Sequence, residues 1–366
     1  LPRTEHWPLL VFHLHASQRE EVGLCSGIAV IAASLVLAVL THHLVEKPAL
    51  AQRGSRGVRG CAAAGLAVLL VTGTWQAVIA GRAQPALASS AETHPGARAL
   101  LSGPADPAPL LPPPVAVYED WVRIERWDCA PMAAFPMDVC AQPPPPTDSE
   151  HPPRPPTRRI VVVGDSHAQQ LTGALIPLAE QHNWQLVTII RGACPFSTAS
   201  EVVPDEPDCL AWNAAAAAEI TTLRPDAVIT LATRDARAGR TEHTPPGFVE
   251  QWLRLQELGI PVVALRDNPR FDHSVPDCVQ HRPDDLDSCG ADRADIYTPD
   301  PPWTRLPDVP ANVTFIDIAD AVCDPQRCPP VIGNILVYLD DNHLTATYTT
   351  TMADLLADRI HTGLGW

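Results

Sequence analysis

The chain has 366 residues, a length that suits one or two domains. Its 42 acidic and 26 basic side chains give a net charge of −16, which argues against a nucleic-acid-binding protein, because such a protein needs a basic face for phosphates. Hydrophobic residues make up 46% of the chain and exclude global disorder, whereas 40 prolines indicate that part of the chain is linker. Because the sequence begins at Leu1 and not at a methionine, we expect it to be part of a longer protein.

Two apolar stretches near the N-terminus predict membrane-spanning helices. Residues 23–40 and 61–80 contain no charged side chain, and each stretch is long enough to cross a bilayer. A signal peptide is the alternative for the first stretch. The connection between them carries four basic side chains against Glu46 alone, so the positive-inside rule assigns it to the cytoplasm and the residues after 82 to the outside.

The residues around these stretches resemble a known membrane family. The letters HWP at residues 6–8, an apolar span and the letters LVEKP at residues 44–48 resemble the last part of the membrane acyltransferase-3 (AT3) family. The resemblance covers residues 1–82, which would be the last helices of a truncated AT3 domain. It implies that most of the AT3 bundle lies upstream, with the lipid bilayer and those helices as partners. It also implies acyl-CoA, most simply acetyl-CoA, as an upstream donor, with no cofactor bound to this chain.

Proline-rich tracts divide the remainder of the chain. Residues 83–117 have the composition of a Pro/Ala-rich linker, and residues 142–156 form a second proline-rich insert. Between the tracts, residues 118–140 are too apolar for pure linker and are expected to pack on the domain that follows. Residues 118–366 are therefore predicted to form one extracytoplasmic domain.

Eight of the ten cysteines lie after the apolar stretches, as neighbours in the sequence. The sequence contains no C-x-x-C pair, so the spacing does not favour zinc, and no metal site is expected. An even number of cysteines on the oxidising side of a membrane favours disulfides, and proximity in sequence is the basis for pairing them. The expected pairs are Cys129 with Cys140, Cys194 with Cys209, Cys278 with Cys289, and Cys323 with Cys328.

From residue 159 onward, short apolar runs alternate with helical patterns. Runs at residues 160–163, 186–190, 227–231, 261–265 and 313–318 predict buried strands. This alternation predicts a three-layer α/β/α domain with a parallel sheet covered on both faces. Sites in such sheets lie at the carboxyl ends of the strands. The predicted helices cover residues 168–181, 210–223, 248–258 and 345–360.

A candidate nucleophile follows the first of these strands. Gly164 permits a tight strand-to-helix turn, and Ser166 then lies at a helix N-terminus, where free N–H groups stabilise a developing oxyanion. The alternative is that Ser166 only caps the helix. A candidate base, His343, lies just before the last predicted helix.

Two aspartates precede His343. Asp340, three residues before it, can hold one ring nitrogen while the other nitrogen takes the Ser166 proton. Asp341 is the other candidate for orienting the His343 ring. The alternative for both aspartates is that they only form a solvated turn at the start of the helix.

The motif GDSH at residues 164–167 with D-x-x-H at residues 340–343 resembles the SGNH hydrolase family, which has a flavodoxin-like α/β/α fold. The letters RGACP at residues 191–195 and NPR at residues 268–270, together with Cys323–Cys328 leading to Tyr338, resemble the SGNH domains that are fused to AT3 domains. The usual Gly-x-Asn after the third strand is replaced by residues 231–235, with the letters LATRD. The usual asparagine oxyanion donor is therefore absent.

Two residues are candidates for completing the oxyanion hole. Arg234 offers a charged donor, and the backbone N–H of Gly192 offers a second one beside that of Ser166. A salt bridge to a nearby carboxylate is an equally weighted explanation for Arg234.

The two resemblances together imply a bacterial multi-pass membrane protein with an extracytoplasmic C-terminal domain. The expected activity is transfer of an acyl group, most simply acetyl, to a hydroxyl of a cell-envelope glycan through a Ser166 acyl-enzyme. One alternative is an O-acetyl esterase that uses the same residues. The other is a non-catalytic, membrane-tethered scaffold that binds glycan.

Overall fold

The structure is a computed structural model, and its chain divides into two units, Leu1–Ala80 and Gly81–Trp366, which are described separately. The described residues are Leu10, His13, 23–43, Lys47, 65–76, 92–144 and 154–366.

The first unit contains the helix α2 (Leu24–Thr41), which overlaps the first predicted span, and residues 65–76 are also helical. None of the described helices combines the length and the apolar composition of a membrane span. The prediction of two spans at 23–40 and 61–80 is therefore unsupported by the described residues. Part of the second span, and the HWP and LVEKP letters apart from Lys47, lie outside them.

The second unit is built on a seven-stranded sheet with the order β1-β2-β4-β3-β5-β6-β8. The five strands from β4 to β8 in this order are parallel, as predicted, and the parallel part is mostly buried. The strands are β1 (Asp128–Pro131), β2 (Asp138–Ala141), β3 (Arg158–Gly164), β4 (Trp184–Ile190), β5 (Ala227–Leu231), β6 (Val262–Leu265) and β8 (Val313–Ile316).

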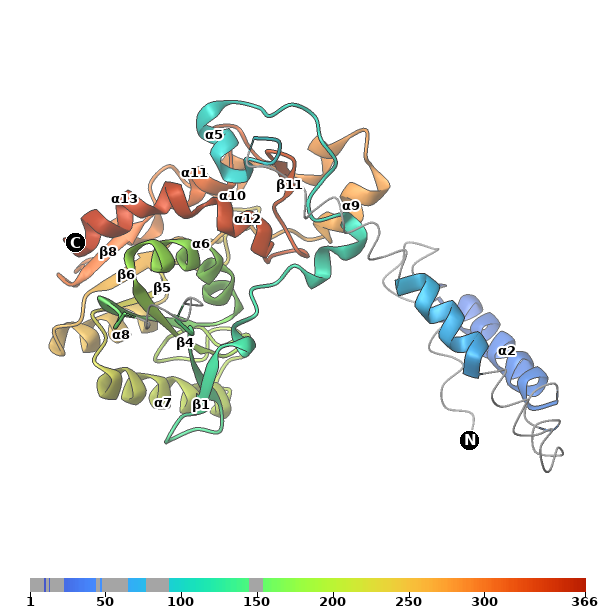
Figure 1. The fold of residues 1–366 in the computed structure, drawn as a ribbon, viewed down its shortest axis with the longest axis horizontal. Helices are drawn as coiled ribbons and strands as arrows, with labels where there is room; N and C mark the ends of the chain where they lie inside the picture. Colours follow the sequence, from blue (N-terminus) through green and yellow to red (C-terminus); the bar gives the residue numbers. More distant parts are fainter. Residues whose placement is uncertain are drawn as a thin grey trace. The chain divides into compact units, whose positions relative to one another are not determined.

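Helices cover both faces of this sheet (Figure 1). On one face, α6 (Ser166–His182) packs against β3 and β4 and against α12 (Ala346–Thr351) and α13 (Ala353–Leu364). The helices α7 (Pro207–Leu223) and α8 (Pro246–Glu257) lie on the other face (Figure 1). The domain is therefore the three-layer α/β/α arrangement that the alternating pattern predicts.

Shorter elements connect these layers. The short helices are α5 (Ala99–Ser102), α9 (Val275–His281), α10 (Arg293–Ile296) and α11 (Ala319–Val322), with 3-10 turns at Gly96–Arg98, Pro114–Glu119, Ile124–Arg126, Leu286–Cys289 and Pro302–Arg305. The short strands are β7 (Ala291–Asp292), β9 (Arg327–Cys328), β10 (Val331–Ile332) and β11 (Ile335–Leu336).

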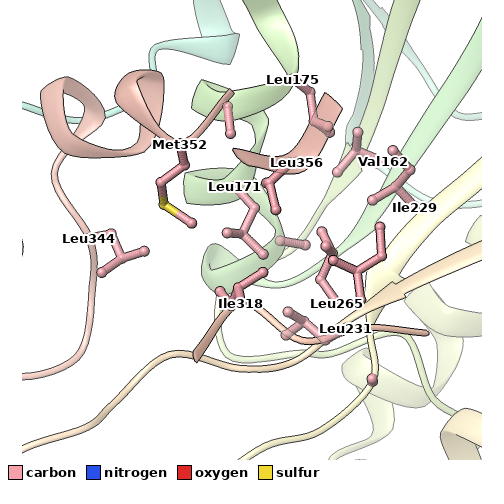
Figure 2. Packing of buried hydrophobic residues seen from close by; sticks show 14 of the residues in the cluster. Val162, Leu171, Leu175, Ile229, Leu231, Leu265, Ile318, Leu344, Met352 and Leu356 are labelled. Atoms are coloured by element: carbon pink, nitrogen blue, oxygen red, sulfur yellow. The ribbon is translucent and has the colours of Figure 1, made fainter. Parts of the chain in front are cut away.

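The core lies on both faces of the sheet, and the side that faces α6 positions the site. Figure 2 shows Val162 of β3 and Leu265 of β6 in the same cluster as Leu171 of α6 and Leu356 of α13. Each of these side chains is at most 2% exposed, and burying one stabilises the fold by roughly 1.5–3 kcal/mol. This packing fixes the start of α6, and with it Ser166, against the carboxyl ends of the strands.

The sheet is not wholly parallel, which corrects the sequence prediction. The strands β1 and β2 form an antiparallel hairpin, and β2 pairs antiparallel with β4. The two cysteines of the first expected pair, Cys129 and Cys140, lie directly opposite each other in this hairpin. The antiparallel direction arises because the two short strands are joined by a tight connection and add to the open edge of β4.

Four disulfides join the expected pairs within the second unit. Cys129–Cys140 closes the edge hairpin, and the bridge between Cys194 and Cys209 ties the loop after β4 to the first turn of α7. All four loops are short, the longest having a sequence separation of 15.

Residues that enter the domain pack on its surface. The side chain of Asn334 donates hydrogen bonds to the carbonyls of Thr93 and Asp106, both 2.8 Å long. Leu111 is 4% exposed and forms a β-bridge with Ile335. The part of residues 83–117 that the structure describes is therefore attached to the segment that precedes the D-x-x-H motif.

Candidate active site

Ser166 is the first residue of α6, directly beyond the turn that ends β3. Gly164 has a φ of +149°, and a Cβ there would lie 2.9 Å from the Cβ of Ala168, so the turn requires glycine. The side chain of Asp165 caps the helix by accepting a hydrogen bond of 3.0 Å from the backbone N–H of His167. Because Asp165 takes the capping position, the capping explanation for Ser166 does not hold, and its hydroxyl is available for other contacts.

The Ser166 hydroxyl contacts the predicted base. The Nε2 atom of His343 lies 2.8 Å from Oγ of Ser166, and Nδ1 of His343 lies 2.7 Å from Oδ2 of Asp340. The other carboxylate oxygen of Asp340 accepts from the backbone N–H groups of His343, at 2.7 Å, and Asn342, at 2.8 Å. These contacts connect the carboxylate of Asp340, the ring of His343 and the hydroxyl of Ser166 in one chain of hydrogen bonds.

The same contacts set the charge of Asp340. Burial by itself would raise the pKa of this carboxyl, but its hydrogen bond to His343, the charge of that ring and the two backbone N–H groups lower the pKa below its ordinary value. Asp340 is therefore a carboxylate near neutral pH, and a carboxylate stabilises the imidazolium that forms when His343 takes a proton. The ring of Trp121 also packs edge-on against His343, with the ring centroids 5.3 Å apart.

Asp341 contacts a different side chain. Its Oδ1 accepts a hydrogen bond of 2.8 Å from Nδ2 of Asn342, and its backbone carbonyl accepts from Phe271. Of the two candidate orienters, Asp340 is thus the one within hydrogen-bond distance of the His343 ring.

A cavity of about 160 Å³ opens beside the hydroxyl. Its walls include Ser166 and His343, the apolar side chains of Pro195, Val202 and Leu231, and the guanidinium-bearing Arg234. A cavity of this size, with an apolar side, has room for a short acyl group beside the nucleophile.

The two candidate oxyanion donors differ in their surroundings. Arg234 lines the cavity, as an oxyanion donor would. It also forms ion pairs with Glu201, at 3.8 Å, and with Asp235, at 3.3 Å, as the salt-bridge explanation expects. In the turn after β4, Ala193 lines the cavity, whereas the preceding residue, Gly192, does not. The oxyanion roles of Arg234 and Gly192 remain predictions.

Sequence reasoning missed a buried polar cluster beside the triad. His167, Asp267 and Asn268 are each 1% exposed, and Nδ1 of His167 lies 2.6 Å from Oδ1 of Asp267. The two available signals were the histidine in GDSH and a polar run that starts directly after the last residue of β6. Among the described residues, no group of three or more histidine, cysteine or acidic side chains is arranged to hold a metal ion.

A mostly parallel sheet with serine, histidine and aspartate in hydrogen-bond contact at the carboxyl ends of its strands defines an SGNH-type domain of the acyl-transferring or ester-hydrolysing class. Residues 129–358 match the family model described as "SGNH domain (fused to AT3 domains)", and the chain belongs to this family. The match does not reach residues 1–82, and the AT3 resemblance of those residues stays a prediction.

Among solved structures, the chain is similar to the periplasmic domain of the lipopolysaccharide acetyltransferase of Salmonella ser. Paratyphi A. The sequences are 13% identical, the alignment covers 57% of this chain and 85% of the other, and the TM-score is 0.43. No curated protein gives a significant match.

Proposed function

We propose that this domain transfers an acyl group, most simply acetyl, to a hydroxyl of a cell-envelope glycan. The observation that carries the proposal is the contact chain from Oγ of Ser166 to His343, 2.8 Å, and from His343 to Asp340, 2.7 Å. The small cavity beside the hydroxyl, which fits a short acyl chain, supports the acetyl group.

In the first step, Oγ of Ser166 attacks the carbonyl carbon of the acyl donor, and Nε2 of His343 takes the hydroxyl proton. The new C–O bond forms, the bond to the leaving group breaks, and His343 returns the proton to the leaving group. In the second step, a glycan hydroxyl loses its proton to His343 and attacks the acyl carbon. The ester bond to Ser166 then breaks, and its oxygen takes the proton back from His343. The backbone N–H groups of Ser166 and Gly192 and the guanidinium of Arg234 are the proposed oxyanion donors.

The proposed setting is the outer side of a bacterial membrane. The four disulfides support it, because they persist in oxidising compartments. The family description, which names fusion to AT3 domains, supports an AT3 bundle as the source of acyl groups drawn from cytoplasmic acyl-CoA. No bound cofactor takes part in the two steps proposed for this domain.

The test uses the full 366-residue chain with p-nitrophenyl acetate as the donor and a de-O-acetylated bacterial envelope oligosaccharide as the acceptor. We expect a burst of p-nitrophenol, an acetyl group on Ser166 detectable by mass spectrometry, and acetylated oligosaccharide. The Ser166→Ala variant is expected to lose all three. If the chain gives the burst and hydrolyses the acetyl ester but does not acetylate the oligosaccharide, the domain is an esterase and the transfer proposal is wrong. If wild type and Ser166→Ala give the same background rate, the non-catalytic scaffold becomes the better explanation.

A further inference from the structure

A second aspartate–histidine pair lies beside the triad, and its histidine, His167, lines the same cavity as Ser166. His167 is the next residue after Ser166, and its ring centroid lies 5.0 Å from that of His343. Its Nδ1 contacts Oδ1 of Asp267 at 2.6 Å, and its Nε2 contacts Oδ1 of Asn342 at 2.9 Å. Both nitrogens of one buried ring are therefore in hydrogen bonds to oxygen atoms.

The partner of Nδ1 is an ionised carboxylate. Asp267 also accepts from the guanidinium of Arg270, at 3.1 and 3.2 Å, and from the backbone N–H of Asn268 at 3.0 Å. Although burial alone would raise the pKa of this carboxyl, the charges of His167 and Arg270 hold the pKa well below its ordinary value. A carboxylate only accepts hydrogen bonds, so Nδ1 of His167 carries a proton.

The partner of Nε2 is also an acceptor. The amide nitrogen of Asn342 donates to Oδ1 of Asp341 at 2.8 Å. Turning the amide over would bring its oxygen against a carboxylate oxygen, which offers no proton. The amide oxygen of Asn342 therefore faces His167, and Nε2 of His167 also carries a proton. A histidine that donates from both nitrogens is an imidazolium.

The charged groups around the ring fit this assignment. Asp267 and Arg270 face it from the segment after β6, Asp165 from the turn before α6, and His343 from the loop before α12. Burial by itself lowers the pKa of His167, and Arg270 also lowers it. The charge of Asp267, its hydrogen bond and the charge of Asp165 outweigh both effects and raise the pKa above its ordinary value.

This ring joins the two segments that carry the triad. Ser166 and His167 begin α6, whereas Asp340, Asn342 and His343 lie on one loop. Side-chain contacts that cross between these segments include Ser166 with His343 and His167 with Asn342, and Oε1 of Gln170 in α6 accepts from the backbone N–H of Leu344. Once Ser166 is acylated, its Oγ has no proton to donate, so the first contact loses its donor. The contact from His167 then remains, beside the contacts that Gln170, Asn268 and Phe271 make to the backbone of the loop. It is the contact that holds the side chain of Asn342, the residue next to His343.

We propose that His167 is a buried imidazolium, paired with Asp267, that acts as a positioning residue: it holds Asn342 so that His343 stays aligned during the second step, in which the acyl group leaves Ser166. The proposal about the second step rests on the proposed function, whereas the charge of the ring does not.

The charge is tested first, on the full wild-type chain with 15N-labelled histidine. The His167 signals are assigned by their loss in His167→Gln. We expect both ring nitrogens of His167 to have the chemical shift of a protonated nitrogen at pH 7. One protonated and one bare nitrogen at pH 7 would overturn the imidazolium assignment, whatever the activity of the chain.

The positioning role is tested by separating the two steps with p-nitrophenyl acetate. In His167→Gln we expect the burst to keep its rate within about threefold and the steady-state rate to fall about 10- to 100-fold, the scale of a displaced catalytic group. Acetyl-Ser166 then accumulates and is counted by mass spectrometry. Asn342→Ala, which leaves the pair of His167 and Asp267 in place, is expected to behave in the same way.

The matched control is His182→Gln. His182 is the last residue of the same helix, where it contacts His361 and Trp184 away from the cavity, so both rates are expected to be unchanged. Equal slowing of burst and steady state in both His167→Gln and Asn342→Ala would overturn the positioning role. An unchanged steady-state rate in folded Asn342→Ala would also overturn it. If the wild-type chain gives no acetyl-Ser166 at all, the proposed function fails, and the NMR result still decides the charge.

Discussion

Replacing Asp340 by asparagine isolates the electrostatic part of the triad. In the wild type, one carboxylate oxygen accepts from two backbone N–H groups at 2.7 and 2.8 Å, and the other faces Nδ1 of His343 at 2.7 Å. In Asp340→Asn, the amide oxygen can keep both backbone hydrogen bonds, so the amide nitrogen is turned toward His343. The nitrogen donates to Nδ1, which moves the ring proton to Nε2. A protonated Nε2 cannot accept the Ser166 proton.

The expected loss follows from this change of tautomer. Hydrolysis of p-nitrophenyl acetate by Asp340→Asn should fall about 10³- to 10⁴-fold in kcat, which corresponds to about 4–5.5 kcal/mol of transition-state stabilisation. The melting temperature should change little, because the loop keeps its backbone contacts. Asp354→Asn is the matched control, since it only weakens an exposed ion pair with Arg98. A folded Asp340→Asn that retains a tenth or more of the wild-type kcat would refute the reasoning.

Three further predictions concern the stability of the domain. Gly173→Ala should destabilise the fold by about 1–2 kcal/mol in urea unfolding, because the new Cβ would lie 2.2 Å from Oγ1 of the buried Thr349. Alanine is the better helix former, so unchanged or increased stability would contradict this explanation. Replacing Cys194 and Cys209 together by serine opens a loop with a sequence separation of 15 and should cost about 3 kcal/mol of unfolding free energy; an unchanged unfolding free energy would contradict this. Because the pKa of His167 is raised in the folded state, its protonation stabilises the fold fully below about pH 6.5 and loses this effect as the pH rises through the folded pKa. The difference in unfolding free energy between wild type and His167→Gln should therefore shrink from pH 6 to pH 9, and a constant difference would show that the ring does not titrate with folding.

The parallel part of the fold was predictable because its strands are short apolar runs bounded by polar turns. The run at 227–231 is a strand with the same bounds in the structure, and β3 begins and ends within two residues of its predicted run. The hairpin of β1 and β2 was not predicted. All four residues of β1 are exposed and one is Pro131, so this strand has neither the alternation nor the apolar run by which a strand is recognised.

The candidate site divides in the same way. Spacing alone brought Asp340 and His343 onto one turn, and the strand-to-helix position of Ser166 indicated where they would meet. The partner of His167 lies 100 residues away in the sequence. That contact depends on β5 and β6 following β3 in the sheet order, which brings the segment after β6 beside the start of α6. Without the sheet order, the sequence does not indicate which of the acidic residues contacts His167, so Asp267 could not be predicted as its partner.

The attachment of the entering chain has a consequence for how the domain is presented. Leu111 exchanges backbone hydrogen bonds with Asn334, at 3.0 Å, and with Leu336, at 2.7 Å, and Asp340 follows four residues later. The chain thus reaches the domain at the segment that leads into the loop bearing His343. A pull on the entering residues would load this loop before it loaded the strands of the sheet. Residue 111 belongs to the same unit as the triad, so these backbone hydrogen bonds make the entering residues part of the support of the loop that bears His343.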